Sequence, residues 1–194
     1  GFNALHYAAM NDSVKTLKYL LSKKVNVNCK TFDGISPLYL AASENNVESL
    51  QILLESGADI DIKTKAWYTP LHAAVLSNAY ESCKILIENN AEMCTHSAEG
   101  LTPLIEAASL GYLNIVELIV EKGEFVDQSD YIKRTSLMWA SLNNHINVAE
   151  YLLKKGACVI KKGIDGFDAL FCAQTEEMRN LLIQNGAKVT VMHC

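Results

Sequence analysis

Apolar residues recur along the chain in a pattern that repeats every 33 positions. Leucine and alanine each hold one position of the period six times, at Leu5, Leu38, Leu71, Leu104, Leu137 and Leu170 and at Ala8, Ala41, Ala74, Ala107, Ala140 and Ala173. Residues three apart lie on one face of a helix, so each Leu–Ala pair predicts a short helix that a second helix can approach closely. A second apolar run in each period, for example residues 113–119, predicts a longer helix.

Residues that start and stop helices follow the same period. Proline preceded by a hydroxyl residue occurs at Ser36-Pro37, Thr69-Pro70 and Thr102-Pro103, and Thr135 continues the series. A hydroxyl caps free backbone N–H groups, and proline fits the first helical turn, so helices are expected to begin near 36, 69, 102 and 135. Residues that accept a left-handed backbone mark the ends of the first helices, at Asp12, Asn45, Asn78, Gly111 and Asn144. The second helices are expected to end at Lys24, Gly57, Asn90, Gly123 and Gly156.

The chain therefore divides into six similar repeats within one predicted domain, 1–194. Their approximate bounds are 1–30 (partial), 31–63, 64–96, 97–129, 130–162 and 163–194. No repeat can bury its own apolar face, so the repeats must stack into an all-α solenoid. The last repeat has three residues fewer between its leucine and its final glycine, and Thr175, Glu176 and Glu177 make it more polar. It is predicted to be a shortened C-terminal cap.

These six repeats resemble ankyrin repeats. The resemblance is carried by Gly34-Ile35-Ser36-Pro37-Leu38, Thr69-Pro70-Leu71-His72-Ala73-Ala74, Gly100-Leu101-Thr102-Pro103-Leu104 and Gly57-Ala58-Asp59-Ile60-Asp61, and it extends over essentially the whole chain. It implies helix-turn-helix units with β-turn or hairpin fingers. It also implies a non-catalytic module that binds a protein or peptide on its concave face, through the turn tips and the exposed side of the first helices.

The predicted partner-binding residues are rich in aromatic and large aliphatic side chains, which favour protein interfaces. The turn tips supply Phe32, Ile35, Trp67, Tyr68, Leu101, Tyr131 and Arg134, with Ile132 and Phe167 beside them. Opposite the Leu–Ala face, the first helices supply Leu76, Glu106, Leu110, Trp139 and Leu142. The alternative is that these side chains pack on the neighbouring repeat. Trp67 and Lys133 stand where other turns have glycine, so these two turns are expected to be strained or to differ in shape.

Charge narrows the classes of partner. The formal net charge is −5 and the pI is about 5.5, which disfavours nucleic acid and anionic membranes. No apolar run approaches the length of a membrane-spanning helix. Fourteen of the 22 acidic residues lie in residues 44–127, so a partner with a basic segment is one hypothesis and a solvated acidic surface is the other. Glu99 and Glu106 are the acids expected nearest the binding surface.

No pattern for catalysis, a cofactor or a metal emerges. The six cysteines, including Cys83 and Cys194, form no CxxC pair, and Cys83 falls among core positions. His6 and His72 share one position of the repeat, which the resemblance assigns to hydrogen bonding between turns. Reduced thiols without a visible signal peptide favour an intracellular protein, cytoplasmic or nuclear.

Two other functions stay open. The repeats could recruit the partner or substrate of a larger enzyme, such as a ubiquitin ligase adaptor or an acyltransferase. They could instead form an architectural or self-assembling scaffold, although a monomer is expected.

Overall fold

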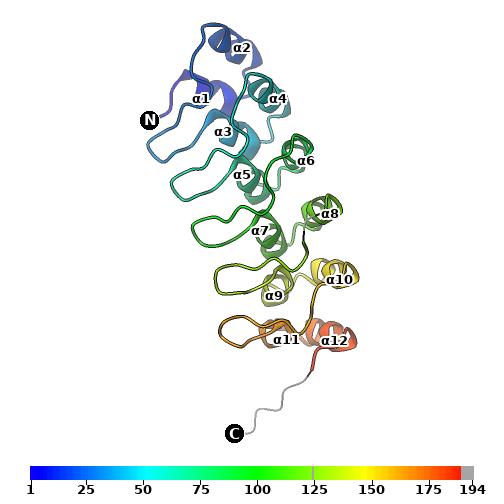
Figure 1. Ribbon diagram of the computed structural model, residues 1–194. Helices are drawn as coiled ribbons and strands as arrows, with labels where there is room; N and C mark the ends of the chain where they lie inside the picture. Colours follow the sequence, from blue (N-terminus) through cyan, green and yellow to red (C-terminus); the bar gives the residue numbers. More distant parts are fainter. Residues whose placement is uncertain (124, 189–194) are drawn as a thin grey trace. The chain divides into compact units, whose positions relative to one another are not determined.

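The computed structural model describes residues 1–123 and 125–188. The chain forms two compact units, unit 1 (residues 1–99) and unit 2 (residues 100–194), and each is described by itself. The described residues are helical, with one isolated β-bridge between Ser129 and Thr135, which agrees with the predicted all-α class (Figure 1). None of these helices has the length and apolarity that crossing a membrane requires.

Unit 1 contains three helix pairs. They are α1 (Ala4–Met10) with α2 (Val14–Ser22), α3 (Pro37–Ser43) with α4 (Val47–Glu55), and α5 (Pro70–Leu76) with α6 (Tyr80–Glu88). The first helices pack side by side, with α3 between α1 and α5, and the second helices pack in the order α2, α4, α6. The unit is therefore two layers of helices, as the paired apolar patterns predict.

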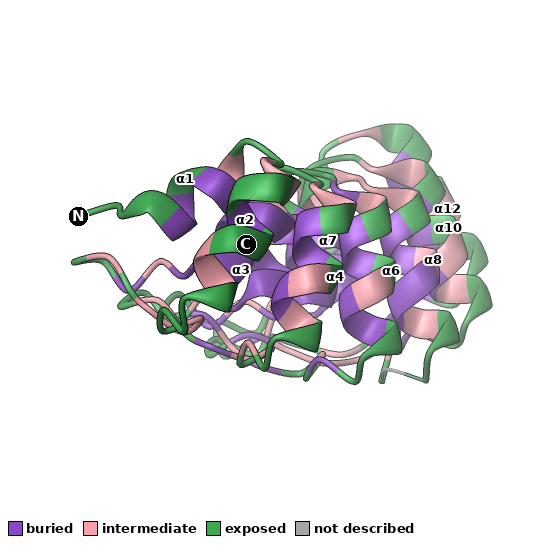
Figure 2. Cartoon of the chain, turned by 90° about the horizontal axis from the view of Figure 1, so that it is seen from above, coloured by how far each residue is buried: buried purple, intermediate pink, exposed green. Residues whose placement is uncertain are grey.

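Unit 2 repeats this arrangement with three further pairs. They are α7 (Pro103–Leu110) with α8 (Leu113–Glu121), α9 (Ser136–Leu142) with α10 (Ile146–Lys154), and α11 (Ala169–Cys172) with α12 (Glu176–Gln184). Helix α9 lies between α7 and α11, and α10 lies between α8 and α12. In both units buried residues gather where the layers meet (Figure 2). The recurring leucines and alanines are at most 8% exposed, so the predicted inward face is confirmed.

The helix boundaries follow the predicted chemistry. Ser36, Thr69, Thr102 and Thr135 each cap a first helix, accepting a hydrogen bond from the backbone N–H three residues on. The predicted helix stops are left-handed, from Asp12 (φ 48°) and Lys24 (φ 58°) to Gly123 (φ 97°).

The turns between pairs are joined to one another. In unit 1 the backbone N–H of Lys65 donates to Asp33 O (2.9 Å), and that of Ala98 donates to Ala66 O (2.9 Å). In unit 2 Ile164 donates in the same way to Ile132 O (2.8 Å). These bonds hold successive turn tips in register, so side chains at the tips project from a fixed edge of each unit.

The last repeat departs from the pattern at its first helix. Helix α11 has 4 residues, whereas the other first helices have 7 or 8. The backbone leaves it through an extended Ala173 (φ −67°, ψ 122°), and Thr175 then caps α12 with its side chain. The three missing residues are thus taken from the last turn of α11.

Candidate functional site

The turn tips of both units carry exposed apolar side chains. In unit 1 Phe32 is 78% exposed and Trp67 is 54% exposed, while Leu76 is exposed at the end of α5. In unit 2 Tyr131, at the repeat position of Phe32, and Leu110, at the end of α7, are exposed. Folding leaves these side chains in solvent, as expected of a surface that contacts another molecule.

The other predicted binding residues, apart from Glu106, are only partly accessible. Half-buried side chains are found at Ile35, Tyr68, Leu101, Arg134, Trp139 and Leu142. The ring of Tyr68 meets that of buried His72 edge-on, with centroids 5.6 Å apart, so part of the tyrosine supports the turn. Lys65 lies over the exposed ring of Phe32, with its ammonium 3.5 Å from the centroid.

The expectation for Glu106 is corrected. Its side chain is 3% exposed, and Leu40 and Ala73, at the same repeat position, are 8% and 2% exposed. Helix α9 packs along α7, and α3 is packed between α1 and α5, so neighbouring first helices cover this position. Glu106 therefore offers no free carboxylate on the surface, whereas Glu99 is exposed.

The two turns without glycine adopt the usual conformation. Trp67 has φ 63° and Lys133 has φ 64°, close to the left-handed values of the glycines in other turns. Their N–H groups donate to Thr64 O and Asp130 O, each at 3.0 Å, as Gly34 does to Thr31 O. Of the two expected outcomes, a changed shape is excluded, and the residues carry the cost of a left-handed backbone instead.

Buried Asp130 organises the turn that carries Arg134. Its carboxylate accepts hydrogen bonds from the backbone N–H groups of Ile132 (3.0 Å) and Arg134 (2.8 Å) and from Trp139 Nε1 (3.0 Å). Trp139 thus has a structural role in the free protein. Asp130 was not singled out from the sequence, although an aspartate at the start of a turn is a common signal.

Arg134 is held from two further sides. Its Nη2 donates to Asp165 Oδ2 (2.9 Å), and its guanidinium lies 5.9 Å from the ring centroid of Trp139. The hydrogen bond from Arg134 keeps the pKa of the Asp165 carboxyl below its usual value. The guanidinium is therefore fixed in place in the absence of a ligand.

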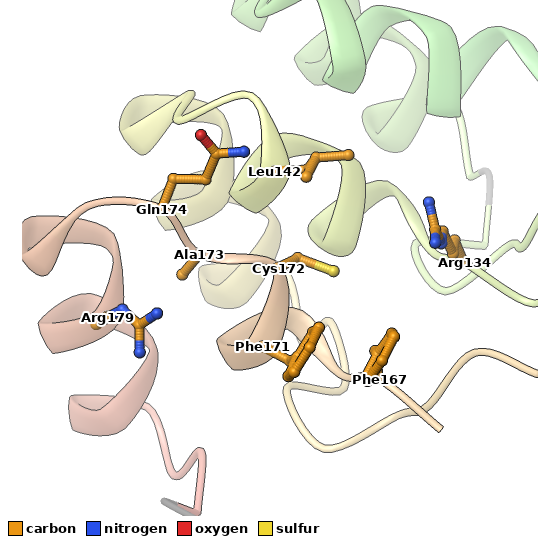
Figure 3. Close-up of a pocket in the computed structure, with 8 residues that line it drawn as sticks. All are labelled: Arg134, Leu142, Phe167, Phe171, Cys172, Ala173, Gln174 and Arg179. Atoms are coloured by element: carbon orange, nitrogen blue, oxygen red, sulfur yellow. The ribbon is translucent and has the colours of Figure 1, made fainter. Parts of the chain in front are cut away.

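Beside Arg134, unit 2 contains a pocket of about 370 Å³, here called the terminal pocket (Figure 3). It is lined by Arg134, Leu142, Phe167, Phe171, Cys172, Ala173, Gln174 and Arg179. It lies next to the end of α9, where the shortened α11 gives way to an extended segment. The pocket is open to solvent, because Phe171, Gln174 and Arg179 are exposed.

Phe171, Cys172, Gln174 and Arg179 are lining residues that the sequence did not predict as binding residues. The deletion in the last repeat was visible in the sequence, and it was interpreted only as part of a cap. Its consequence, a gap beside Leu142, depends on which turn of the helix is lost. Which turn is lost depends on how the last repeat packs on α9, and no local sequence motif indicates it.

Two titratable groups considered from the sequence, Cys83 and His6, have pKa values shifted by burial. Burial raises the pKa of Cys83 to about 12, so this thiol stays protonated. Burial lowers the pKa of His6, whose Nε2 donates to Ile35 O (3.0 Å), consistent with the bond between turns that the resemblance implies. In residues 1–123 and 125–188, no group of three or more His, Cys, Asp or Glu side chains is placed to hold a metal. His193 and Cys194 lie outside the described residues.

Comparison with known proteins agrees with the repeat structure. The family model described as "Ankyrin repeats (3 copies)" matches residues 1–64 and 61–130, and "Ankyrin repeat" matches residues 133–163. The human ASB11 ankyrin repeat domain is similar in structure, with a TM-score of 0.86 and 28% identity over 96% of this chain and 85% of that one.

An ankyrin repeat domain from Acinetobacter baumannii has the same TM-score of 0.86, with 28% identity over 95% of this chain and 98% of that one. Among curated proteins, none matches the sequence.

Proposed function

Because the chain belongs to the ankyrin-repeat family, whose members are generally protein–protein interaction modules, we propose that it binds a protein or peptide through its turn tips and the exposed ends of its first helices. The observation that carries the proposal is the exposure of aromatic side chains at the turn tips of each unit, at Phe32, Trp67 and Tyr131. Aromatic residues are enriched in the buried parts of protein interfaces.

Trp67 strengthens this proposal. A bulky residue in the left-handed region costs about 1 kcal/mol or more relative to glycine. Trp67 is 54% exposed, so about half of its surface stays available to a partner. A binding role gives a reason for tryptophan at a position where glycine would fold more easily.

The acidic residues that recur every 33 positions on the second helices do not lie on this surface. Glu48 and Glu55 on α4, and Glu81 and Glu88 on α6, are exposed side chains of the second helices. A basic partner would therefore be attracted to the second-helix side of unit 1.

We expect the chain itself to be monomeric, which light scattering tests.

Affinity purification with matched variants tests the function. The tip variant combines Phe32→Ser with Trp67→Ser, and the control combines Tyr19→Ser on α2 with Ile183→Ser on α12, which are also exposed. The wild type and the control should retain a partner that the tip variant loses, with similar melting temperatures for all three. Retention by the tip variant, or equal loss from the control, would contradict the proposed surface.

A further inference from the structure

The terminal pocket has an apolar surface that lies between two cationic side chains, Arg134 and Arg179. Leu142, Phe167, Phe171 and Ala173 supply the apolar surface, and the rings of Phe167 and Phe171 are stacked with centroids 3.6 Å apart. Figure 3 shows Arg134 at one end of this surface and Arg179 at the other, with Phe171 and Cys172 between them. None of the eight lining residues is acidic.

Arg134 is prepared to bind an anion. Its Nη2 donates to Asp165, and 28% of its side chain remains exposed. The planar guanidinium has five N–H donors, so further donors are left for a second carboxylate. Because Asp165 and Trp139 already fix the side chain, binding would cost little additional conformational entropy.

Arg179 is an exposed cation on α12. Its guanidinium makes no hydrogen bond or ion pair with residues 1–123 or 125–188. The nearby carboxylates do not neutralise it. Asp165 binds Arg134, Asp168 accepts the N–H of Phe171 (3.0 Å), and Glu176 forms no ion pair with Arg179.

From this charge complementarity, and on the premise that the proposed function is correct, we propose that the terminal pocket binds an acidic peptide segment of a partner protein. One large apolar or aromatic side chain of the segment would lie against Phe171 and Leu142. Carboxylates before and after it would reach Arg134 and Arg179. An internal segment suits the pocket because it is open to solvent, so a chain can enter and leave.

A fluorescent peptide with one phenylalanine between two pairs of glutamates is the probe, and its anisotropy is measured against intact protein. Saturable binding is expected, and it should weaken as salt rises because ion pairs are screened. Replacing the glutamates by glutamines, or the phenylalanine by alanine, should each weaken binding about tenfold or more. Equal binding of the glutamine peptide, or no binding at millimolar protein, would overturn the proposal.

Two protein variants with the same change in charge test where the peptide binds. Arg179→Glu alters the pocket, whereas Lys154→Glu alters an exposed lysine at the end of α10 that does not line it. Arg179→Glu should weaken binding about tenfold while Lys154→Glu leaves it within twofold. Equal weakening would show that only long-range charge acts, and would overturn the site.

Alkylation gives a second, independent readout. Bound peptide should protect Cys172, which lines the pocket, while exposed Cys158 continues to react. Protection of both thiols or neither would contradict the assignment.

This proposal and the general function can fail separately. If Arg179→Glu retains the cellular partner that the tip variant loses and the probe does not bind, the acidic-peptide pocket is wrong and the protein-binding function stands. If the tip variant also retains the partner, the proposed binding surface itself is wrong.

Discussion

At the scale of single residues, position in the repeat determines backbone conformation more strongly than residue type does. Lys133 and Trp67 adopt left-handed φ values of 64° and 63°, although glycine holds the same place elsewhere. The bonds of the turn thus impose the conformation, and the non-glycine residues carry the strain.

Exchanging glycine and non-glycine residues in the turns of unit 2 should measure that strain. Lys133→Gly is expected to raise the free energy of unfolding by about 1 kcal/mol. Gly166→Ala, at the same turn position with φ 80° and no atom within 4 Å of an added Cβ, should lower it by about 1 kcal/mol. Urea unfolding checks both values, and a stabilising Gly166→Ala would show that the turn is unstrained.

His6 makes the stability of unit 1 depend on pH. Its burial lowers its pKa, so the folded protein resists protonation while the unfolded chain takes up a proton near the ordinary value of 6.5. The unfolded state then binds more protons, so stability is complete above this value and falls as the pH decreases toward the folded pKa.

Chemical unfolding at pH 7.5 and 5.5 tests this linkage. The wild type should lose more stability than His6→Gln between the two values. An equal loss would mean that other groups cause the pH dependence.

Residue patterns also explain which of the predicted binding residues are exposed. Exposure of Phe32, Trp67 and Leu76 follows from their phase within the repeat. Burial of Glu106 does not follow, because it depends on how closely the neighbouring helix approaches. The bond from Trp139 to Asp130 likewise joins a helix to a turn, so Trp139 is a poor probe of binding alone.

At the scale of elements, the short first helices carry both the core and the exposed surface. The sequence predicted their starts through hydroxyl caps and prolines, and their ends through left-handed residues. It did not predict which turn of α11 would be lost, since a deletion can be accommodated in a helix or in a loop.

One pair of substitutions in α7 separates the two faces. Leu104 is fully buried, so Leu104→Ala should cost about 2–5 kcal/mol of unfolding free energy through lost burial and a cavity. Leu110 in the same helix is 40% exposed, so Leu110→Ala should cost no more than about 0.5 kcal/mol. Similar costs for both, measured in urea, would contradict the assigned inward face.

At the scale of the whole molecule, repetition explains why the fold is easier to predict than the partner. The repeats share the spacing that builds their helices, apart from the shortened α11, while the side chain at one tip position varies from Phe32 to Lys65 to Tyr131. The repeated positions define the fold, and the varying ones are available for recognition.

Photo-crosslinking is the most direct test of the binding surface. A benzophenone amino acid is placed in living cells at Trp67 on a turn tip or at Tyr19 on a second helix, both exposed. A specific crosslinked partner is expected from position 67 and not from position 19. Crosslinking from position 19 alone, or equally from both positions, would contradict the account.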